Sequence, residues 1–498
     1  MKKIINIILI ITLFGATYSC DVLELNPQSS LSSATFFKTE KDAQLALTGI
    51  YSYMLTNNAF NHARKLWDGL SDVAHSYAGI TIGNVDATNG GLWYIYTGCY
   101  SMIARCNNFL VNVDAVEMDS RLKEQYKGEV YFLRALSYFT LSEFWGGVPV
   151  YTQPPTIEES KIRQSPKSEV VELVLSDLDL AIASLPDVAY AGHAVKGSAM
   201  ALKAKVLMHN EQWADAASLS KSIIDGGKFG LYTGGYPNLF IKPGQNNNPE
   251  IMFSVRYQKP DIICPQTADG NPDLAGAWDL TVVPLRYFID LFQCTDGKPI
   301  DESPLYDPND LFKNRDPRIT LMAVSENHQF PDGSECNIQG RLLNGTGFYT
   351  NKYVDWNNYE GAWGWAVRSD QDFILIRYAE VLLMYAECQN EIAGPDASVY
   401  NAVNAIRTRP SVEMPELPAD LSKDRMRQAI QNERLYELGL EGLRYWDLKR
   451  WKTIESVYAK IINPGGDQRR FDPSKHYVFP FSQSELDRNP NLVQNPNY

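Results

Sequence analysis

Apolar residues recur at helical spacing over most of the first half of the chain. The pattern predicts long helices over residues 34–54, 92–113, 122–145 and 168–184. Trp-Gly-Gly-Val-Pro at 145–149 should end the third helix sharply, because glycine and proline do not continue a helix. The first half is therefore predicted to be a helical scaffold.

Small residues at matching positions predict two helix pairs. Ala204 and Ala216 lie twelve residues apart in 196–226, on two predicted helices joined by a turn that leads into Trp213. This pattern resembles a tetratricopeptide hairpin, in which small side chains let antiparallel helices approach closely. Residues 373–391 and 398–409 are predicted to form another such pair.

The pattern changes between residues 232 and 371. Gly, Pro, Asn and Asp become dense, and only short strand-like runs such as 251–257 appear. Loops of this length in a compact protein usually carry function. We expect a mostly α-helical fold in which a tetratricopeptide-like scaffold of helix pairs supports a loop-rich, irregular region with short strands.

The N-terminus carries an export signal. Basic residues at 2–3 precede an apolar run over 4–14, which is too short to span a bilayer. Cys20 follows at the offset of a bacterial lipoprotein cysteine, and Ser19 suits the small position before it. We expect a signal peptide at 1–19 and lipidation of Cys20; soluble secretion with a free cysteine is the alternative.

Composition and charge exclude several classes of function. The net charge of −13 leaves no basic stripe for nucleic acid and no basic surface for docking on anionic lipid. The cysteines and the six histidines show no CxxC pair, zinc spacing or HExxH motif, and GxSxG and P-loop motifs are absent from the sequence. We therefore predict no metal and no cofactor.

Two pairs of carboxylates have a spacing that suits acid–base chemistry. Glu380 and Glu387 are seven residues apart on a predicted helix, and Glu437 and Glu441 are four apart. Glycosidases place two carboxylates across the bond that they cleave. Arginines are interleaved at helical spacing, however, so we interpret these carboxylates as members of structural ion pairs.

Asp68 and Asp72 lie four residues apart near Trp67. Such a pair could bind calcium or a sugar hydroxyl, or it could be a solvated or capped helix face. We retain Asp72 as a candidate ligand-binding residue.

Aromatic residues are the best guide to a binding surface. The stretch 348–365 holds seven of them in 18 positions, where the chain average of 12% predicts about two. They alternate with Asn, Gly, Asp and Glu, and a flat ring suits the apolar face of a sugar while such polar groups suit its hydroxyls. The alternative is that these rings pack the loops onto the helices. The candidates from this stretch are Trp356, Tyr359, Trp363 and Trp365.

Many short motifs, in order along the chain, resemble the SusD/RagB-like outer-membrane lipoproteins of Gram-negative bacteria. The match opens with Cys-Asp-Val-Leu-Glu-Leu-Asn-Pro at 20–27 and extends nearly to the end of the chain. Its other parts lie at 36–43, 49–51, 132–135, 145–149, 296–300, 315–318, 376–380, 385–387, 433–434, 437–438, 441–448 and 450–451.

The resemblance implies a division of the mature chain and two further site residues. It implies a helical region at 20–231, a ligand-binding insertion at 232–371 and a C-terminal helical region at 372–498. Relatives carry ligand aromatics in the stretch that here holds Trp278, and ligand contacts in loops such as the one before Trp93. Both residues are therefore added as candidates.

The resemblance also implies a function. It implies a lipid-anchored surface protein that binds a nutrient, usually a glycan, without cutting it. The protein would deliver this ligand to a SusC-type TonB-dependent barrel of the outer membrane, over which it sits as a lid. The alternatives are a binder of non-glycan cargo such as peptides and a lipid-anchored glycoside hydrolase.

Overall fold

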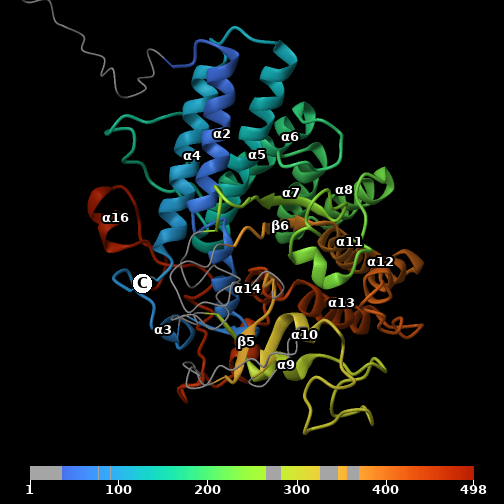
Figure 1. Ribbon diagram of the computed structural model, residues 1–498. Coiled ribbons are helices and arrows are strands. Elements are labelled where there is room, and N and C mark those ends of the chain that lie inside the picture. Colours follow the sequence, from blue (N-terminus) through green and yellow to red (C-terminus); the bar gives the residue numbers. More distant parts are fainter. Residues whose placement is uncertain (1–35, 77, 90, 265–281, 326–345, 356–368) are drawn as a thin grey trace, which may run out of the picture.

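The computed structural model describes residues 36–76, 78–89, 91–264, 282–325, 346–355 and 369–498 (Figure 1). Four long helices stand side by side in the upper part of Figure 1. They are α2 (Glu40–Thr56), α4 (Trp93–Val113), α5 (Ser120–Trp145) and α6 (Lys167–Ser184). The four helices predicted from the sequence are thus confirmed, and their ends differ from the predicted ends by a few residues.

Local residues explain where these helices begin and end. Thr39 caps α2: its side chain accepts a hydrogen bond from Asp42 N at 3.3 Å, and Asp42 Oδ2 accepts one from Thr39 N at 2.9 Å. The helix α5 ends at Gly146, whose φ of 71° is a conformation that glycine adopts without strain. The predicted stop at 145–149 is confirmed.

The first predicted helix pair is confirmed as α7 (Lys196–His209) and α8 (Trp213–Gly226). Ala204 and Ala216 are both fully buried in the main hydrophobic core. Small side chains at these positions allow the two helices to pack closely.

The second predicted pair is wrong at its start. Residues 373–377 form the strand β6 (Phe373–Arg377), and only then does α11 (Tyr378–Ala393) begin, followed by α12 (Ala397–Arg407). The strand pairs in antiparallel fashion with β2 (Ile251–Val255), which confirms the strand-like run in that region. All five residues of β6 are buried, and a short apolar run of this kind fits a buried strand as well as a helix.

The remaining elements are short, apart from one helix. Within the described parts of 232–371 the elements are brief strands and helical turns, and the predicted bounds of this region stay predictions. The remaining elements are η1 (His62–Leu70), β1 (Ala74–His75), α3 (Ala78–Thr81), η2 (Tyr236–Phe240), β3 (Val283–Pro284), α9 (Arg286–Leu291), α10 (Ile319–Met322), β4 (Ala323–Ser325), β5 (Phe348–Thr350), α13 (Lys423–Leu438), α14 (Arg444–Arg450), α15 (Ile454–Tyr458) and α16 (Gln483–Arg488).

Two hydrophobic clusters hold these elements together. The larger one joins the helices of both halves and includes Trp67, Trp145 and Trp446. The smaller one includes Phe288 of α9 and Phe348 of β5. None of the helices in the described part of the chain is long and apolar enough to cross a membrane.

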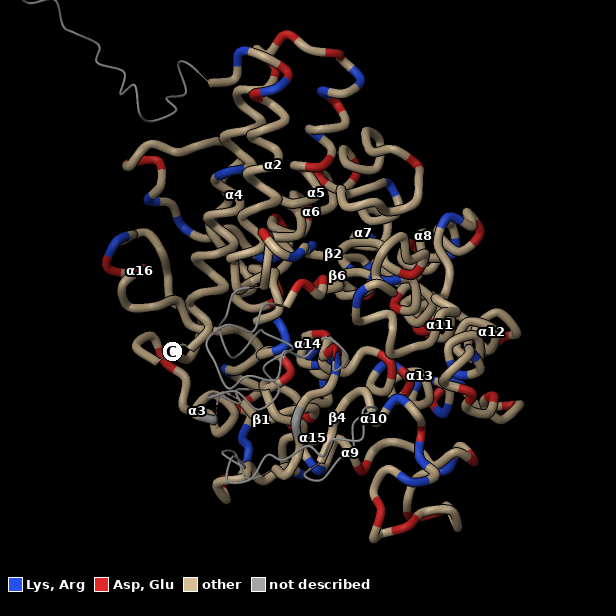
Figure 2. The backbone as a smooth tube through the Cα atoms, in the orientation of Figure 1, with Lys and Arg blue, Asp and Glu red and all other residues tan. Residues whose placement is uncertain are grey.

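Charged residues also lie inside the protein. Figure 2 shows blue and red segments together in the centre of the molecule, near β6 and α13. Five cationic and five anionic side chains, each at most 3% exposed, form one set of linked ion pairs, which we call the charge network. Its members are Glu250, Asp316, Arg318, Lys352, Arg377, Arg407, Arg409, Glu433, Glu437 and Glu441.

Candidate functional site

The described residues that border segments 265–281, 326–345 and 356–368 lie close together. We call residues 264, 282–284, 323–325, 348–355 and 369 the stem region. Cys264 N donates a hydrogen bond to Ser369 O at 2.8 Å. The strands β4 and β5 pair through Ser325 and Phe348, and β3 pairs with β1 and contacts β5. Every segment in which the sequence places candidate ligand aromatics, Trp93 apart, is thus attached to one part of the fold.

The stem region rests on packed aromatic rings. Phe292 lies 5.1 Å from both Phe288 and Tyr436, measured between ring centroids, and all three rings are buried. Tyr436 also donates a hydrogen bond from its hydroxyl to Leu291 O at 2.9 Å. These contacts give the stem region a packed base.

A second aromatic group packs against the start of β6. The ring of Tyr353 lies 5.3 Å from His62 and 5.4 Å from Phe373. His62 Nε2 lies 2.7 Å from Gln371 O, and burial, with a contribution from Lys65, lowers the pKa of His62 to about 3. The imidazole is therefore neutral and donates its Nε2 proton to this carbonyl.

The predicted aromatic site residues are only partly within view. Trp278, Trp356, Tyr359, Trp363 and Trp365 lie outside the described residues, so their roles stay predictions.

Trp93 is the first residue of α4 and is half-buried, stacked on Tyr96 with ring centroids 4.2 Å apart. Tyr96 is buried beneath it. Trp93 therefore has an accessible side on a firm support.

The prediction for Asp72 needs correction, because the structure buries this residue. Its side chain is 2% exposed, and its two oxygens accept hydrogen bonds from Arg444 Nε and Nη2, both at 2.9 Å. Asp68 is also buried and accepts a hydrogen bond from Gly442 N at 2.7 Å. Asp72 is thus a structural residue, and sequence spacing alone missed its partner because Arg444 is 372 residues away.

Asp72→Asn is expected to lower the free energy of unfolding by about 1.5–3 kcal/mol, because one buried charge loses its partner. Urea denaturation measures this change. Glycan affinity should stay within about twofold of the wild type, measured on the folded protein. A stable variant with lost affinity would restore Asp72 to the binding site.

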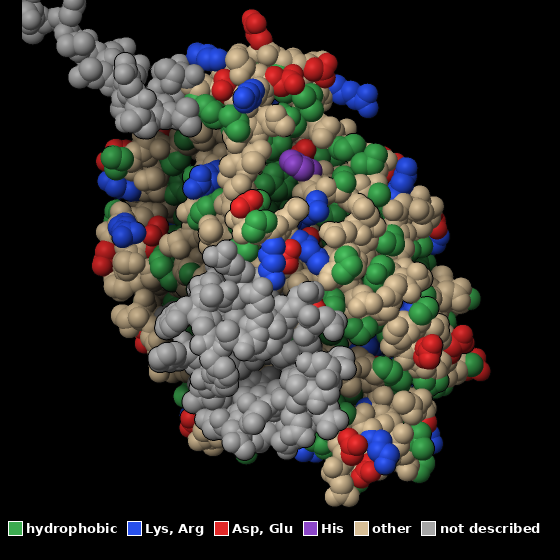
Figure 3. Space-filling model, viewed as in Figure 1, with side chains coloured by type: hydrophobic (Ala, Val, Ile, Leu, Met, Phe, Trp, Pro, Cys, Tyr) green, Lys and Arg blue, Asp and Glu red, His purple; other side chains and the backbone are tan. Residues whose placement is uncertain are grey.

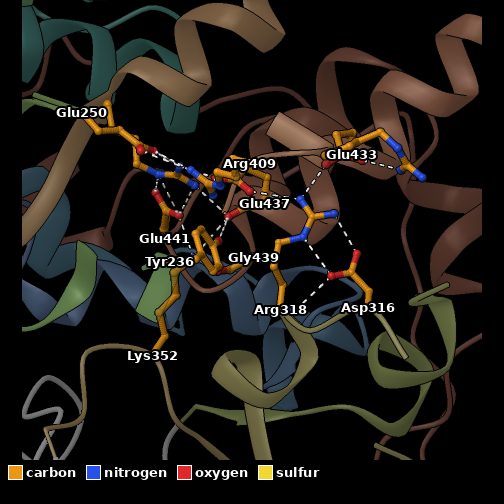
Figure 4. A network of polar contacts seen from close by, with 12 residues as sticks. Tyr236, Glu250, Asp316, Arg318, Lys352, Arg409, Glu433, Glu437, Gly439 and Glu441 are labelled. Atoms are coloured by element: carbon orange, nitrogen blue, oxygen red, sulfur yellow. Dashed lines mark hydrogen bonds and ion pairs between the residues drawn. The ribbon is translucent and has the colours of Figure 1, made fainter. Parts of the chain in front are cut away.

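Glu437 and Glu441, one of the two candidate catalytic pairs, belong to the charge network (Figure 4). Glu437 Oε1 lies 2.6 Å from Arg377 Nη1, and its Oε2 lies 3.1 Å from Arg318 Nη1. Glu441 Oε1 lies 2.7 Å from both Lys352 Nζ and Arg377 Nη2. Figure 4 shows the side chains of Glu437 and Glu441 within this network, among Arg318, Arg409 and Lys352.

These contacts fix the ionisation of both groups. Burial alone would raise the pKa of Glu437, but Arg409, Arg377 and Arg318 outweigh it and hold that pKa below the usual range. In the same way, Arg377 and Lys352 outweigh burial and lower the pKa of Glu441. A glycosidase acid needs a raised pKa, so neither carboxylate suits that role.

The other pair is also engaged. Glu380 Oε2 lies 2.9 Å from Lys205 Nζ. Glu387 Oε2 accepts a hydrogen bond from Arg450 Nη2 at 2.7 Å, and Glu387 Oε1 accepts one from the Trp451 indole at 2.7 Å. The interpretation of these carboxylates as ion-paired scaffold is confirmed.

Sequence reasoning missed a polar junction at the border of the stem region. Asp372 Oδ1 accepts a hydrogen bond from Tyr257 N at 2.9 Å and lies 3.2 Å from Lys242 Nζ. Arg256 Nε lies 3.6 Å from the other Asp372 oxygen, and its side chain is 45% exposed. Spacing along the chain gives no signal for this group, because its members come from distant segments.

His193 provides a test of pH dependence near this junction. Its Nδ1 lies 2.7 Å from the buried Glu129 Oε2, and this hydrogen bond raises the pKa of His193 above its ordinary 6.5 against the effect of burial. Because the pKa is higher in the folded state, the stabilisation is complete below about pH 6.5 and is lost as pH rises through the folded-state value.

The stability of the wild type relative to His193→Gln should therefore fall between pH 6 and pH 9. The fall should be at most about 1 kcal/mol, because the imidazole is more than half exposed and solvent screens the pair. Thermal unfolding of both proteins across this range measures it. Parallel curves for the two proteins would contradict the assignment.

The described side chains offer no evident metal centre. Within the ranges that the structure describes, no three His, Cys, Asp or Glu residues come together as a metal site would require. The described cysteines Cys99, Cys106, Cys294 and Cys388 are free and buried, and Cys264 is buried as well.

Two family models match the chain. The model described as the SusD family matches residues 244–498. The model described as starch-binding associating with outer membrane matches residues 22–208.

Individual proteins give the same result over the whole chain. SusD-like proteins P2 and P38 of Formosa agariphila are 26% and 28% identical, over 100% of this chain and 99% and 100% of their own lengths. A crystal structure of a SusD-like carbohydrate-binding protein from Bacteroides fragilis has a TM-score of 0.80 and 26% identity, covering 92% of this chain and 100% of that one. A laminarin-binding SusD-like protein shares the fold, with a TM-score of 0.70 and 23% identity over 93% of this chain and 100% of that one.

Proposed function

Because this chain belongs to the SusD family, we propose that it is a glycan-binding protein of the bacterial surface that holds its ligand without cutting it. The observation that carries the proposal is that the segment with Trp278 and the aromatic-rich segment 356–368 both border one packed stem region. The carbohydrate-binding relative from Bacteroides fragilis supports the same class of ligand.

The chemistry of the candidate residues fits a sugar. Indole and phenol rings cover the apolar C–H face of a pyranose, and burying such a ring is worth on the order of 1.5–3 kcal/mol before ordering costs. We propose Trp93, Trp278, Trp356, Tyr359, Trp363 and Trp365 as the residues that supply these faces. Asp72 is withdrawn from this set because Arg444 occupies both of its oxygens.

We propose that the protein is anchored in the outer membrane through a lipid on Cys20 and faces the cell exterior. The family model that describes starch binding in association with the outer membrane supports this location. The acyl chains would hold the protein at the bilayer, at about 0.8 kcal/mol for each buried CH₂ group.

A SusC-type TonB-dependent barrel is the proposed partner that imports the ligand. The binding protein would rest over the barrel mouth and hand over its cargo by a lid-like movement. Deleting the barrel should abolish uptake while the purified binding protein keeps its affinity. Loss of both would contradict this division of labour.

A combined binding and product assay tests the proposed function. Purified protein is screened on a glycan array, and each hit is measured by calorimetry and then incubated for product analysis. Binding with the glycan recovered intact supports the proposal. Shortened products would identify a hydrolase, and binding of peptides without glycans would identify the alternative cargo.

A further inference from the structure

Six polar atoms in one interior region have no hydrogen-bond partner among the residues that the structure describes. The residues that carry them are at most 2% exposed. Four atoms are donors and two are carboxylate acceptors. They are Arg64 Nη1, Trp67 Nε1, Arg434 Nη1, Trp446 Nε1, Asp68 Oδ1 and Glu380 Oε1, and we call these residues the interior polar cluster.

Ring contacts place the first members of this cluster together. The rings of Trp67 and Trp446 lie 5.2 Å apart, and Arg64 Cζ lies 4.3 Å and 5.1 Å from their centroids. Arg64, Trp67 and Asp68 all come from η1, whereas Trp446 comes from α14.

Electrostatic effects place the remaining members beside them. Burial lowers the pKa of Lys205, and the charges of Arg64 and Arg434 lower it further, while its ion-pair partner Glu380 opposes this shift. The same carboxylate acts on Arg64. Glu380 on α11 and Arg434 on α13 therefore lie within electrostatic range of Lys205, and Glu380 also lies within electrostatic range of Arg64.

The charge of Arg64 is incompletely compensated. Its guanidinium lies over two indole rings, and burial lowers its pKa to about 10 although Glu380 and Asp68 partly offset the effect. The neighbouring cations have direct partners: Lys205 pairs with Glu380, and Arg434 Nε lies 2.8 Å from Asp447 Oδ2.

Unpaired donors and unpaired acceptors occur together in this cluster, and they do not hydrogen-bond to one another. A buried polar group without a partner is strongly unfavourable, so such groups in folded proteins are normally paired or hydrated. An anion would satisfy only the four N–H groups and would leave the carboxylate oxygen of Glu380 without a donor. Water both donates and accepts, and it typically makes about three hydrogen bonds in such a site.

We infer that the interior polar cluster is a binding site for ordered water molecules that connect the carboxylates of Asp68 and Glu380 to the N–H groups of Arg64, Trp67 and Trp446. This site joins η1 to α11 and α14, which lie more than 300 residues further along the chain. The water molecules are thus part of the contact between η1 and the helices α11 and α14.

Magnetic relaxation dispersion of ¹⁷O in water, which counts long-lived internal water molecules, tests the inference with Trp446→Phe. The variant should lose at least one such molecule per chain, because it removes an indole N–H. Trp145→Phe is the matched control: this indole is 1% exposed, but its N–H already donates to Pro480 O at 3.1 Å, so the water count should stay unchanged. Equal counts in the wild type and Trp446→Phe would overturn the inference.

A crystal of the wild-type protein soaked in sodium bromide gives an answer that does not depend on a variant folding. Water density between Asp68, Glu380 and Arg64, without an anomalous bromide peak, supports the inference. A bromide peak in the cluster would show an anion site instead. An empty cluster would also overturn the proposal.

Discussion

Arg377→Met is expected to lower the free energy of unfolding by about 3–5 kcal/mol, because it removes one partner from a buried set of ion pairs. Arg377 Nη1 lies 2.9 Å from Glu250 and 2.6 Å from Glu437, and Arg377 Nε lies 2.9 Å from Glu441 Oε2. Methionine keeps most of the packing volume, but Glu250, Glu437 and Glu441 each lose one cationic partner. Urea denaturation monitored by circular dichroism measures the loss.

Arg427→Met on α13 is the matched control. Arg427 also pairs with carboxylates, and its Nη2 lies 2.8 Å from Glu391 Oε2, but its side chain is 34% exposed. A pair in this setting is worth about 0.2–1 kcal/mol. Equal losses in the two variants would show that burial does not set the importance of the charge network.

The combined variant Trp278→Ala, Trp356→Ala and Trp363→Ala is expected to reduce glycan affinity at least about 100-fold, which corresponds to roughly 2.7 kcal/mol. Each substitution removes a ring that would cover a sugar face. The thermal unfolding midpoint of the same sample shows whether the variant is folded. Calorimetry with the best array hit measures the affinity.

Trp213→Ala serves as the control for this triple variant. Trp213 is a half-buried tryptophan on α8, within the helical scaffold. Its removal should cost some stability and leave the affinity of the folded protein within about twofold. Unchanged affinity in the triple variant would show that the rings bind no ligand.

The helical scaffold could be predicted because its signals are local. Repeated apolar positions, caps and a glycine stop define α4 and α5, and the alanines of the α7–α8 pair lie close together in sequence. The error at 373–377 arose because four consecutive apolar residues carry no periodicity that separates a buried strand from a helix. Only its partner β2, more than 100 residues earlier, settles that choice.

The site could be predicted in part for the same reason. Aromatic density is a local property, so the sequence points to the loop-rich region, and the stem region shows where its segments attach. Pairings are not local: Arg377 meets Glu437 across 60 residues, and Asp72 meets Arg444 across 372. Arginines near glutamates on a helix predict ion pairs in general, but they do not say which residues pair.

The composition of the charge network has a consequence for how such proteins diversify. Its ten members all lie outside segments 265–281, 326–345 and 356–368, and their charges cancel. Exchanging those segments for others would therefore keep all ten of these residues in the chain. We expect that grafting a relative's segments onto this chain transfers that relative's ligand preference.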